Sequence, residues 1–269
     1  MPQSTQSPTQ SKGIFALLKG ESGSGKSTGA LSFGESIYVL DHDRKMPAIA
    51  QKHFPGKEIH YDTFDDVFQV GEALETLVND CPYETIIGDS LTSLSYTALK
   101  TIDDVKGTNI IKMLHNLVAT KGGKQQVELR GFDYYNGEDS FFKFYLDLLK
   151  HLWARDSYPK NVFLTAHVLT TEQTNIVKGT TTVSRRIVTA GNRIAAYIPA
   201  QFDEVWHFGV RPPDLGMDSA RPKHLVWTEA IGDDYAKTAY NLPGMIDFTN
   251  KSLYEIIKNE ISNEQPTKL

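Results

Sequence analysis

Eight consecutive residues constrain this chain more than any other feature. Gly20 to Ser27 are Gly-Glu-Ser-Gly-Ser-Gly-Lys-Ser, the full spacing of a phosphate-binding loop. The apolar run Ile14–Leu18 before it predicts a strand buried in a parallel sheet, and Thr28–Phe33 can continue as a helix. Glycines let a backbone approach an anion closely, and amide groups at a helix start attract phosphate. The motif therefore predicts a nucleotide site, and the alternative is a glycine-rich turn without a ligand.

The loop predicts both a nucleotide and a metal. Lys26 would bridge the β- and γ-phosphates of ATP, and the Ser27 hydroxyl would be a ligand of Mg²⁺. The predicted nucleotide-binding residues are Gly20, Glu21, Ser22, Gly23, Ser24, Gly25, Lys26, Ser27 and Thr28.

A magnesium ion needs a second anchor at the carboxyl end of a neighbouring strand. Asp89 follows the apolar strand that begins at Thr85, as a Walker B aspartate does. We predict Ser27 and Asp89 as the metal ligands. The alternative for Asp89 is a turn residue that caps a helix beginning near Leu91.

The remaining chain alternates predicted strands and helices, which is typical of an α/β three-layer sandwich around a mostly parallel sheet. Alternating Thr, Val and Ile around Lys178-Gly179 predict a β-hairpin over residues 168–190 with Gly179 in its turn. We expect a disordered tail at 1–12, a core at 13–250 with a helical insertion at about 101–156, and a C-terminal helix and tail at 251–269; polar breaks are expected at Gly122-Gly123 and at 136–139.

Composition narrows the class of protein. The chain has 269 residues, enough for one or two domains, and 40% hydrophobic with 23% charged residues is typical of a globular protein. No stretch reaches the about 18 apolar residues of a membrane span, and the first twelve residues do not resemble a signal peptide, so we expect a cytoplasmic protein without membrane contact. Cys81 is the single cysteine, which excludes an internal disulfide. With a net charge of −5, any nucleic-acid contact needs a local basic surface.

As a set, these motifs resemble a known family, the bacteriophage RecA-like P-loop ATPases that include the Sak-type single-strand annealing recombinases. The resemblance covers about residues 13–250. It implies Mg²⁺-dependent ATP hydrolysis coupled to single-stranded DNA binding, assembly into homo-oligomeric rings or filaments, and phage recombination alongside a single-strand DNA-binding protein in the host cytoplasm. It rests on Gly20–Ser27, Asp41-His42-Asp43, Ile87–Leu91, Thr165-Ala166-His167 and Phe202–Val205.

The resemblance also implies a general base and a sensor. Many AAA+ ATPases carry a catalytic glutamate after the Walker B aspartate, whereas this chain has Ser90. RecA-like proteins also have serine there, and their catalytic carboxylate follows another strand, which implies Asp43. Aspartate is one methylene shorter than the usual glutamate. His167 would sense the γ-phosphate. The alternatives are a solvated turn at Asp43 and a structural histidine.

A basic segment follows His167, where RecA-like proteins carry a DNA-contacting loop. Residues 173–202 contain no acidic side chain, and the only aromatic candidate for base stacking before Phe202 is Tyr197. The alternative is an edge hairpin protected from aggregation by its charges. The predicted DNA-binding residues are Lys178, Arg185, Arg186 and Arg193.

A cation near the C-terminus is the last expected catalytic group. In RecA-like proteins, a Lys or Arg in this region reaches the γ-phosphate bound by the next subunit, which implies Lys237 here. Arg211 and Arg221 are weaker candidates, and an ordinary surface lysine is the alternative.

Two other functions remain open from the sequence. One is a P-loop kinase of a small molecule, with Arg185, Arg186 and Arg193 as an arginine-rich lid. The other is an ATP-dependent switch or assembly protein with little turnover, which would bind partners through the 101–156 region.

Overall fold

The computed structural model describes residues 13–104, 134–154, 160–175, 180–212, 221–231 and 234–263. Within these ranges, no helix is both long and apolar enough to span a bilayer. The strands and helices are β1 (Phe15–Gly20), α1 (Lys26–Ala30), β2 (Ile37–Asp41), α2 (Met46–His53), β3 (Ile59–Asp62), α3 (Val67–Asn79), β4 (Thr85–Asp89), α4 (Leu91–Asp104), α6 (Tyr134–Trp153), β5 (Asn161–Asn175), β6 (Thr180–Ile187), α7 (Asn192–Tyr197), the 3₁₀ helix η2 (Ile198–Gln201), β7 (Glu204–Arg211), β8 (Lys223–Trp227), β9 (Met245–Asp247) and α8 (Leu253–Asn263).

The central sheet confirms the expected α/β architecture. Its strand order is β3-β2-β4-β5-β1-β7-β8-β9, and β6 pairs with β5 outside this path. Pairing is parallel from β3 through β7 and antiparallel for β8 and β9. One strand, β5, thus separates the phosphate-loop strand β1 from the Asp89 strand β4.

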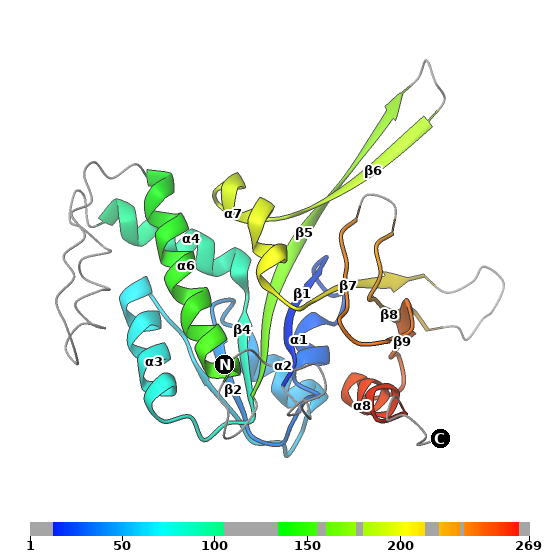
Figure 1. Cartoon of the computed structure of the whole chain (residues 1–269), viewed down its shortest axis with the longest axis horizontal. Coiled ribbons are helices and arrows are strands. Elements are labelled where there is room, and N and C mark those ends of the chain that lie inside the picture. Colours follow the sequence, from blue (N-terminus) through cyan, green and yellow to red (C-terminus); the bar gives the residue numbers. More distant parts are fainter. Residues whose placement is uncertain are drawn as a thin grey trace, which may run out of the picture.

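Two apolar layers enclose the sheet, because alternate residues of a strand point to opposite faces. Phe15 and Leu17 of β1 belong to one buried cluster with side chains of α3, α4 and α6. Ala16 and Leu18 belong to the other cluster, with side chains of α1, α2 and α8. Figure 1 shows these helices on the two faces of the sheet. The C-terminal helix α8 is therefore packed against the core.

The expected polar break at residues 136–139 is wrong, because α6 runs through it. Glu138 is only 1% exposed, and the hydroxyl of Ser95 on α4 donates a hydrogen bond to its carboxylate. A partner on a neighbouring helix lets this polar residue lie inside the protein. Apolar α6 side chains such as Tyr145 and Leu149 complete the packing against the sheet. Residues 134–153 thus form a layer of the core, and the loop expected at Gly122-Gly123 lies outside the described residues.

The expected hairpin is present and continues a core strand. β5 leaves the sheet and pairs with β6 in antiparallel register from Val168 opposite Ile187 to Asn175 opposite Thr180. The hairpin projects from the body of the molecule (Figure 1). Its turn, with Lys178 and Gly179, lies outside the described residues.

Candidate nucleotide-binding site

The register of the sheet brings the predicted motifs to one edge. Gly20 at the end of β1 lies opposite His167 in β5, and Asp41 at the end of β2 lies opposite Asp89 in β4. A cavity of about 330 Å³ opens at this edge. It is lined by Ser22, Gly23, Gly25, Lys26, Ser27, Thr28, Asp43, Lys45, Ile49, Lys52, His53, Asp89, His167 and His224.

The loop backbone requires its glycines. Gly23 and Gly25 have φ values of 79° and 96°, in the left-handed region that side chains disfavour. A Cβ on Gly20 would lie 2.3 Å from the carbonyl oxygen of Phe208, inside the contact limit. The helix that follows is shorter than expected. α1 covers Lys26–Ala30, and after it the amides of Ser32 and Phe33 donate to carbonyl oxygens only three positions back.

Lys26 is held inside the loop. Its ammonium donates hydrogen bonds to the carbonyl oxygens of Gly20 (2.9 Å) and Glu21 (2.8 Å), and the residue is 5% exposed. Burial lowers the pKa of Lys26 to about 8. Beside it, the buried Ser24 hydroxyl has no hydrogen-bond partner within the described part of the chain. A cation and a free donor at a glycine-lined cavity fit the oxygens of a polyphosphate.

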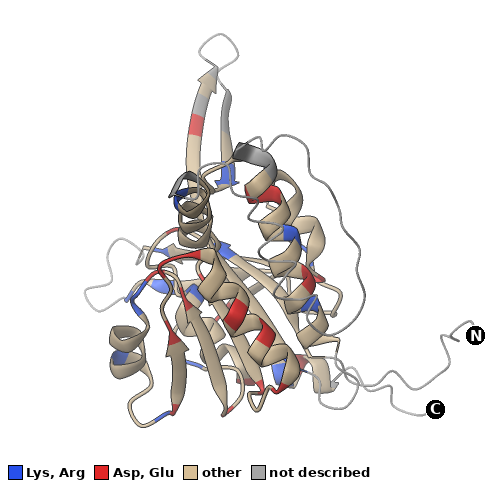
Figure 2. Ribbon diagram, turned by 90° about the vertical axis from the view of Figure 1, so that its left-hand side faces the viewer, with Lys and Arg blue, Asp and Glu red and all other residues tan. Residues whose placement is uncertain are grey.

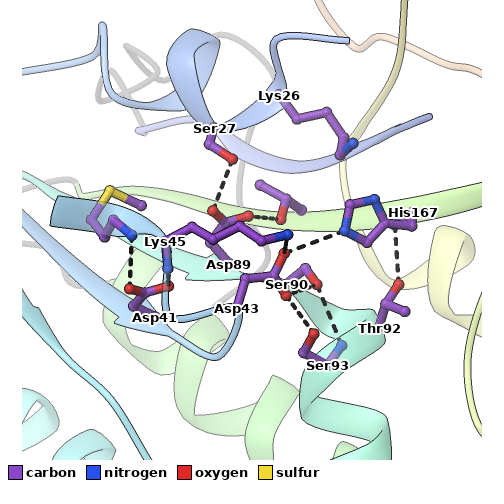
Figure 3. Close-up of polar contacts among 12 residues, drawn as sticks. Lys26, Ser27, Asp41, Asp43, Lys45, Asp89, Ser90, Thr92, Ser93 and His167 are labelled. Atoms are coloured by element: carbon purple, nitrogen blue, oxygen red, sulfur yellow. Dashed lines mark hydrogen bonds and ion pairs between the residues drawn. The ribbon is translucent and has the colours of Figure 1, made fainter. Parts of the chain in front are cut away.

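Ser27 and Asp89 are in direct contact. The Ser27 hydroxyl donates to Asp89 Oδ2 at 2.8 Å, and the Thr165 hydroxyl donates to Oδ1 (Figure 3). Burial raises the pKa of Asp89, which is 3% exposed. The helix-capping role considered for Asp89 belongs to its neighbour Ser90, whose hydroxyl accepts a hydrogen bond from the amide of Ser93.

The oxygens of Ser27 and Asp89 suit Mg²⁺, which takes one or two protein oxygens and completes its shell with phosphate and water. No group of three His, Cys, Asp or Glu side chains in the described ranges could hold a metal ion without such help. The residues present therefore fit a magnesium–nucleotide complex.

The last residue of β2, Asp41, and the two residues that follow it have different surroundings. The Asp41 carboxylate accepts hydrogen bonds from the amides of Lys45 (3.2 Å) and Met46 (2.9 Å), which fixes the start of α2. His42 is buried against the rings of Phe64 and Tyr145. Burial lowers the pKa of His42 to about 3, so its ring is neutral at physiological pH. Asp43 lines the cavity.

Asp43 is held by donors from two other elements (Figure 3). Its Oδ1 accepts hydrogen bonds from the hydroxyls of Ser90 (2.8 Å) and Ser93, and its Oδ2 lies 3.3 Å from Nε2 of His167. Burial by itself would raise the pKa of Asp43, but hydrogen bonds from His167, Ser93 and Ser90 outweigh it and hold the pKa well below its usual range. The Lys45 ammonium lies 3.9 Å from Oδ2. Asp43 is thus an ionised carboxylate at the mouth of the loop.

The structure also fixes the backbone of His167. Its amide donates to the hydroxyl of Thr92 at 3.1 Å, and its side chain is 26% exposed toward the cavity. The predicted sensor and the predicted base therefore face each other.

The chain matches the model of an AAA domain over residues 12–240. It belongs to this AAA domain family of P-loop NTPases. A search of curated proteins found no match.

The sequence did not reveal what holds Asp43 in this AAA domain. Ser90 and Ser93 are three residues apart at the start of α4, a spacing that places both hydroxyls on one side of the helix. This spacing can be recognised in the sequence. Only the pairing of β2 with β4, however, shows that the two hydroxyls face Asp43.

A buried ionic cluster next to the phosphate loop was also not predicted from the sequence. Lys19, next to Gly20, donates to Asp234, and His207 Nδ1 lies 2.9 Å from the other carboxylate oxygen of Asp234. All three residues are less than 9% exposed. Burial by itself would raise the pKa of Asp234, but its contacts with His207 and Lys19 outweigh this effect and lower the pKa. The cluster attaches the segment after residue 233 to β1 and β7.

The predicted DNA-binding residues separate into two groups. Arg185 and Arg186 lie opposite Thr170 and Leu169 in the register of the hairpin, and both line a cavity of about 840 Å³. Figure 2 shows basic ribbon (blue) on the hairpin where it joins the body. The lining of this cavity includes Leu169 and Tyr235, which are 59% and 47% exposed. Arg193 of α7 instead lines a smaller cavity with Asp139, Lys143 and Tyr197. Lys178 lies outside the described residues.

Lys237 is not part of the phosphate cavity. Its backbone exchanges two hydrogen bonds, of 2.9 and 3.0 Å, with Val205 of β7. Val205 in turn pairs with Leu17, which lies three positions before Gly20 in β1. Lys237 is therefore level with the middle of β1 and not with the phosphate loop at its end. A role toward a neighbouring subunit stays a prediction.

Proposed function

We propose that this AAA domain binds ATP with Mg²⁺ and hydrolyses it. The observation that supports the proposal is the meeting of three groups at one cavity. These are the buried Lys26 ammonium, the bonded pair of Ser27 and Asp89, and the facing pair of Asp43 and His167.

Each group has one task in this proposal. Lys26 neutralises phosphate charge. Ser27 and Asp89 would hold a Mg²⁺ ion, which would neutralise more of that charge. Asp43 Oδ2 accepts a hydrogen bond from the attacking water and so orients it. The water oxygen bonds to the γ-phosphorus, the bond to the bridging oxygen breaks, and the water proton passes through Asp43 to the released phosphate. Asp43 thus orients the water and relays its proton.

Phosphate release measured with ATP and Mg²⁺ tests this function. Lys26→Ala should abolish turnover, whereas Lys258→Ala, which changes an exposed lysine of α8, should leave it unchanged. Turnover that survives Lys26→Ala would contradict the proposal.

We further propose that single-stranded DNA binds beside the hairpin and stimulates hydrolysis. Arg185 and Arg186 supply cations, while Tyr235 and Leu169 supply exposed apolar surface at the same cavity. Phosphate contacts and aromatic stacking are the usual means of holding a single strand. The strand β5 connects this cavity to the phosphate site, because it carries both His167 and Leu169.

Binding of a fluorescent oligothymidine across salt concentrations tests the DNA proposal. Each lost phosphate contact should reduce the slope of log affinity against log salt by about 0.7. Arg185→Ala and Arg186→Ala should each show this change, and Arg193→Ala a smaller one. Unchanged slopes for both hairpin variants would contradict it.

The resemblance to Sak-type recombinases supports two wider proposals. The chain would form a homo-oligomeric ring or filament in which Lys237 reaches the nucleotide of the next subunit, and it would act in phage recombination with a single-strand DNA-binding protein. Turnover should then rise more than linearly with protein concentration, and Lys237→Ala should lose turnover while keeping ATP affinity.

The kinase alternative gains no support from the described residues. None of their arginines lines the phosphate cavity, whose basic residues are lysines and histidines. An arginine-rich lid over the phosphates is therefore not seen in this part of the chain.

A further inference from the structure

A second cavity adjoins the phosphate cavity. Its volume is about 500 Å³, and four residues line both spaces: Gly25, Thr28, His53 and His224. The second cavity then extends along α1 past Gly29 and Ser32. It is therefore a continuation of the phosphate site and not an isolated hollow.

The direction of this extension is informative. Lys26, Asp43, Asp89 and His167, the groups that act at the γ-phosphate, line only the first cavity. In a phosphate loop, the backbone holds the α- and β-phosphates and the lysine reaches the β- and γ-phosphates. The nucleoside must then leave the loop at the end away from these groups, where the second cavity begins.

The walls of the second cavity suit a planar ring. Phe248 is 8% exposed, and a Cβ on Gly25 would lie 3.0 Å from its ring atom Cζ. The ring of His224 is centred 5.8 Å from that of Phe248. His53 and Phe54, from the end of α2, complete the lining with a second set of rings. Aromatic faces stack on nucleobases of any kind.

Polar groups at the same cavity suit the remaining parts of a nucleoside. Thr249, Asn250 and Ser252 belong to its lining, and they carry hydroxyl and amide groups of the kind that bond ribose oxygens and base edges.

This wall is attached firmly to the loop. The His224 amide donates to the Thr249 hydroxyl at 2.9 Å, and the Phe248 amide donates to the His224 carbonyl at 3.0 Å. The Tyr254 amide donates to the Ser32 hydroxyl at 3.1 Å, which ties the start of α8 to the end of the loop helix. The pocket is thus preformed.

We infer that this second cavity binds the base and ribose of the nucleotide, with Phe248 as the stacking residue. The inference rests on the proposed ATP site. Phe248 and the polar residues after it lie past residue 240, where the match to the AAA domain ends. The segment from β9 to α8 would then decide which nucleoside this chain accepts.

Comparison of two ligands tests the inference, because tripolyphosphate has the phosphates of ATP and no nucleoside. Affinities of both ligands are measured by calorimetry with Mg²⁺ for the full chain and its variants. Phe248→Ala should weaken ATP binding roughly tenfold, the loss expected for a stacked base, and leave tripolyphosphate affinity unchanged. Lys26→Ala should weaken both ligands.

Two further variants guard against misfolding, because Phe248 is buried. Asn250→Ala changes an exposed residue that lines the second cavity but not the phosphate cavity, and it should weaken ATP binding about threefold without changing tripolyphosphate binding. Asn259→Ala, at an exposed position of α8 away from the lining of both cavities, should change neither affinity. Thermal unfolding identifies any variant that has lost its fold.

The outcomes separate the two proposals. If the unaltered chain binds ATP but Phe248→Ala and Asn250→Ala keep full affinity, the base pocket is wrong and the ATP site stands. If both ligands weaken equally, these residues only support the loop, and the inference is again overturned. If the unaltered chain binds neither ligand, the proposed function fails and the base pocket fails with it.

Discussion

Replacement of Asp43 by asparagine tests the proposed role of the carboxylate that faces His167. Asparagine has the same shape and keeps Oδ1 as an acceptor for the hydroxyls of Ser90 and Ser93. It replaces the charged Oδ2, the atom that faces His167, by an amide group that cannot accept a water proton. We expect turnover to fall about 10²- to 10⁴-fold, the usual contribution of a general base, while ATP affinity is retained.

The change in stability should be small by comparison. The two hydroxyl bonds survive and only the contact with His167 is altered, so the free energy of unfolding should fall by about 1 kcal/mol. Because the folded pKa of Asp43 lies below the unfolded value, its stabilising contribution is complete above about pH 4 and is lost as the pH falls through the folded pKa. The stability difference between variant and parent should therefore shrink in acid.

Single-turnover hydrolysis and equilibrium binding of ATP separate chemistry from affinity. Asp65→Asn is the matched control, because it makes the same change at an exposed carboxylate that pairs with Arg44. Turnover by Asp43→Asn within about threefold of the parent would refute the role of Asp43. Lost ATP affinity would instead show that the carboxylate supports binding.

Three further results are expected. Ser27→Ala and Asp89→Asn should each lower turnover and shift its Mg²⁺ titration to higher concentration, because a metal ligand is lost; a normal titration curve for both would contradict the metal role. ATP affinity should fall as the pH rises above about 8, because burial lowers the pKa of Lys26 to about 8 and the neutral amine attracts phosphate poorly. Calorimetry in buffers of different ionisation enthalpy should then detect proton uptake on binding near that pH, and its absence would count against a titrating Lys26. Ser95→Ala should lower the free energy of unfolding by about 1–3 kcal/mol in urea, because the carboxylate of Glu138 and the amide of Ala190 each lose a partner; an unchanged midpoint would contradict this.

The contacts of each motif required the folded structure. The family resemblance implied a catalytic role for Asp43, whereas Asp41 on the same strand tip was assigned no role from the sequence. Pairing of β2 with β4 brings Ser90 and Ser93 to Asp43, while the start of α2 takes the carboxylate of Asp41. The surroundings of Asp43 depend on contacts with residues 47 and 50 positions away, which no local pattern contains.

The basic segment shows the same limit. Residues 173–202 contain no acidic side chain, yet folding places Asp139 of α6 beside Arg193 and leaves Arg185 and Arg186 at another cavity. The sequence found only Tyr197 as an aromatic neighbour for these cations. The structure adds Tyr235, which reaches the hairpin from the C-terminal part of the chain.

By itself, the sequence determined the phosphate loop, the buried strand before it and the alternating α/β order. These features depend on glycine conformation, apolar runs and spacing within a few residues of each other. The tertiary structure alone decided which strands are neighbours, and hence that Asp89 contacts Ser27, that Asp43 faces His167, and that the β9–α8 segment closes the cavity beside the loop. The physical reason is that strand order and helix packing depend on burial of apolar surface over the whole chain, whereas a loop motif is specified by local backbone sterics.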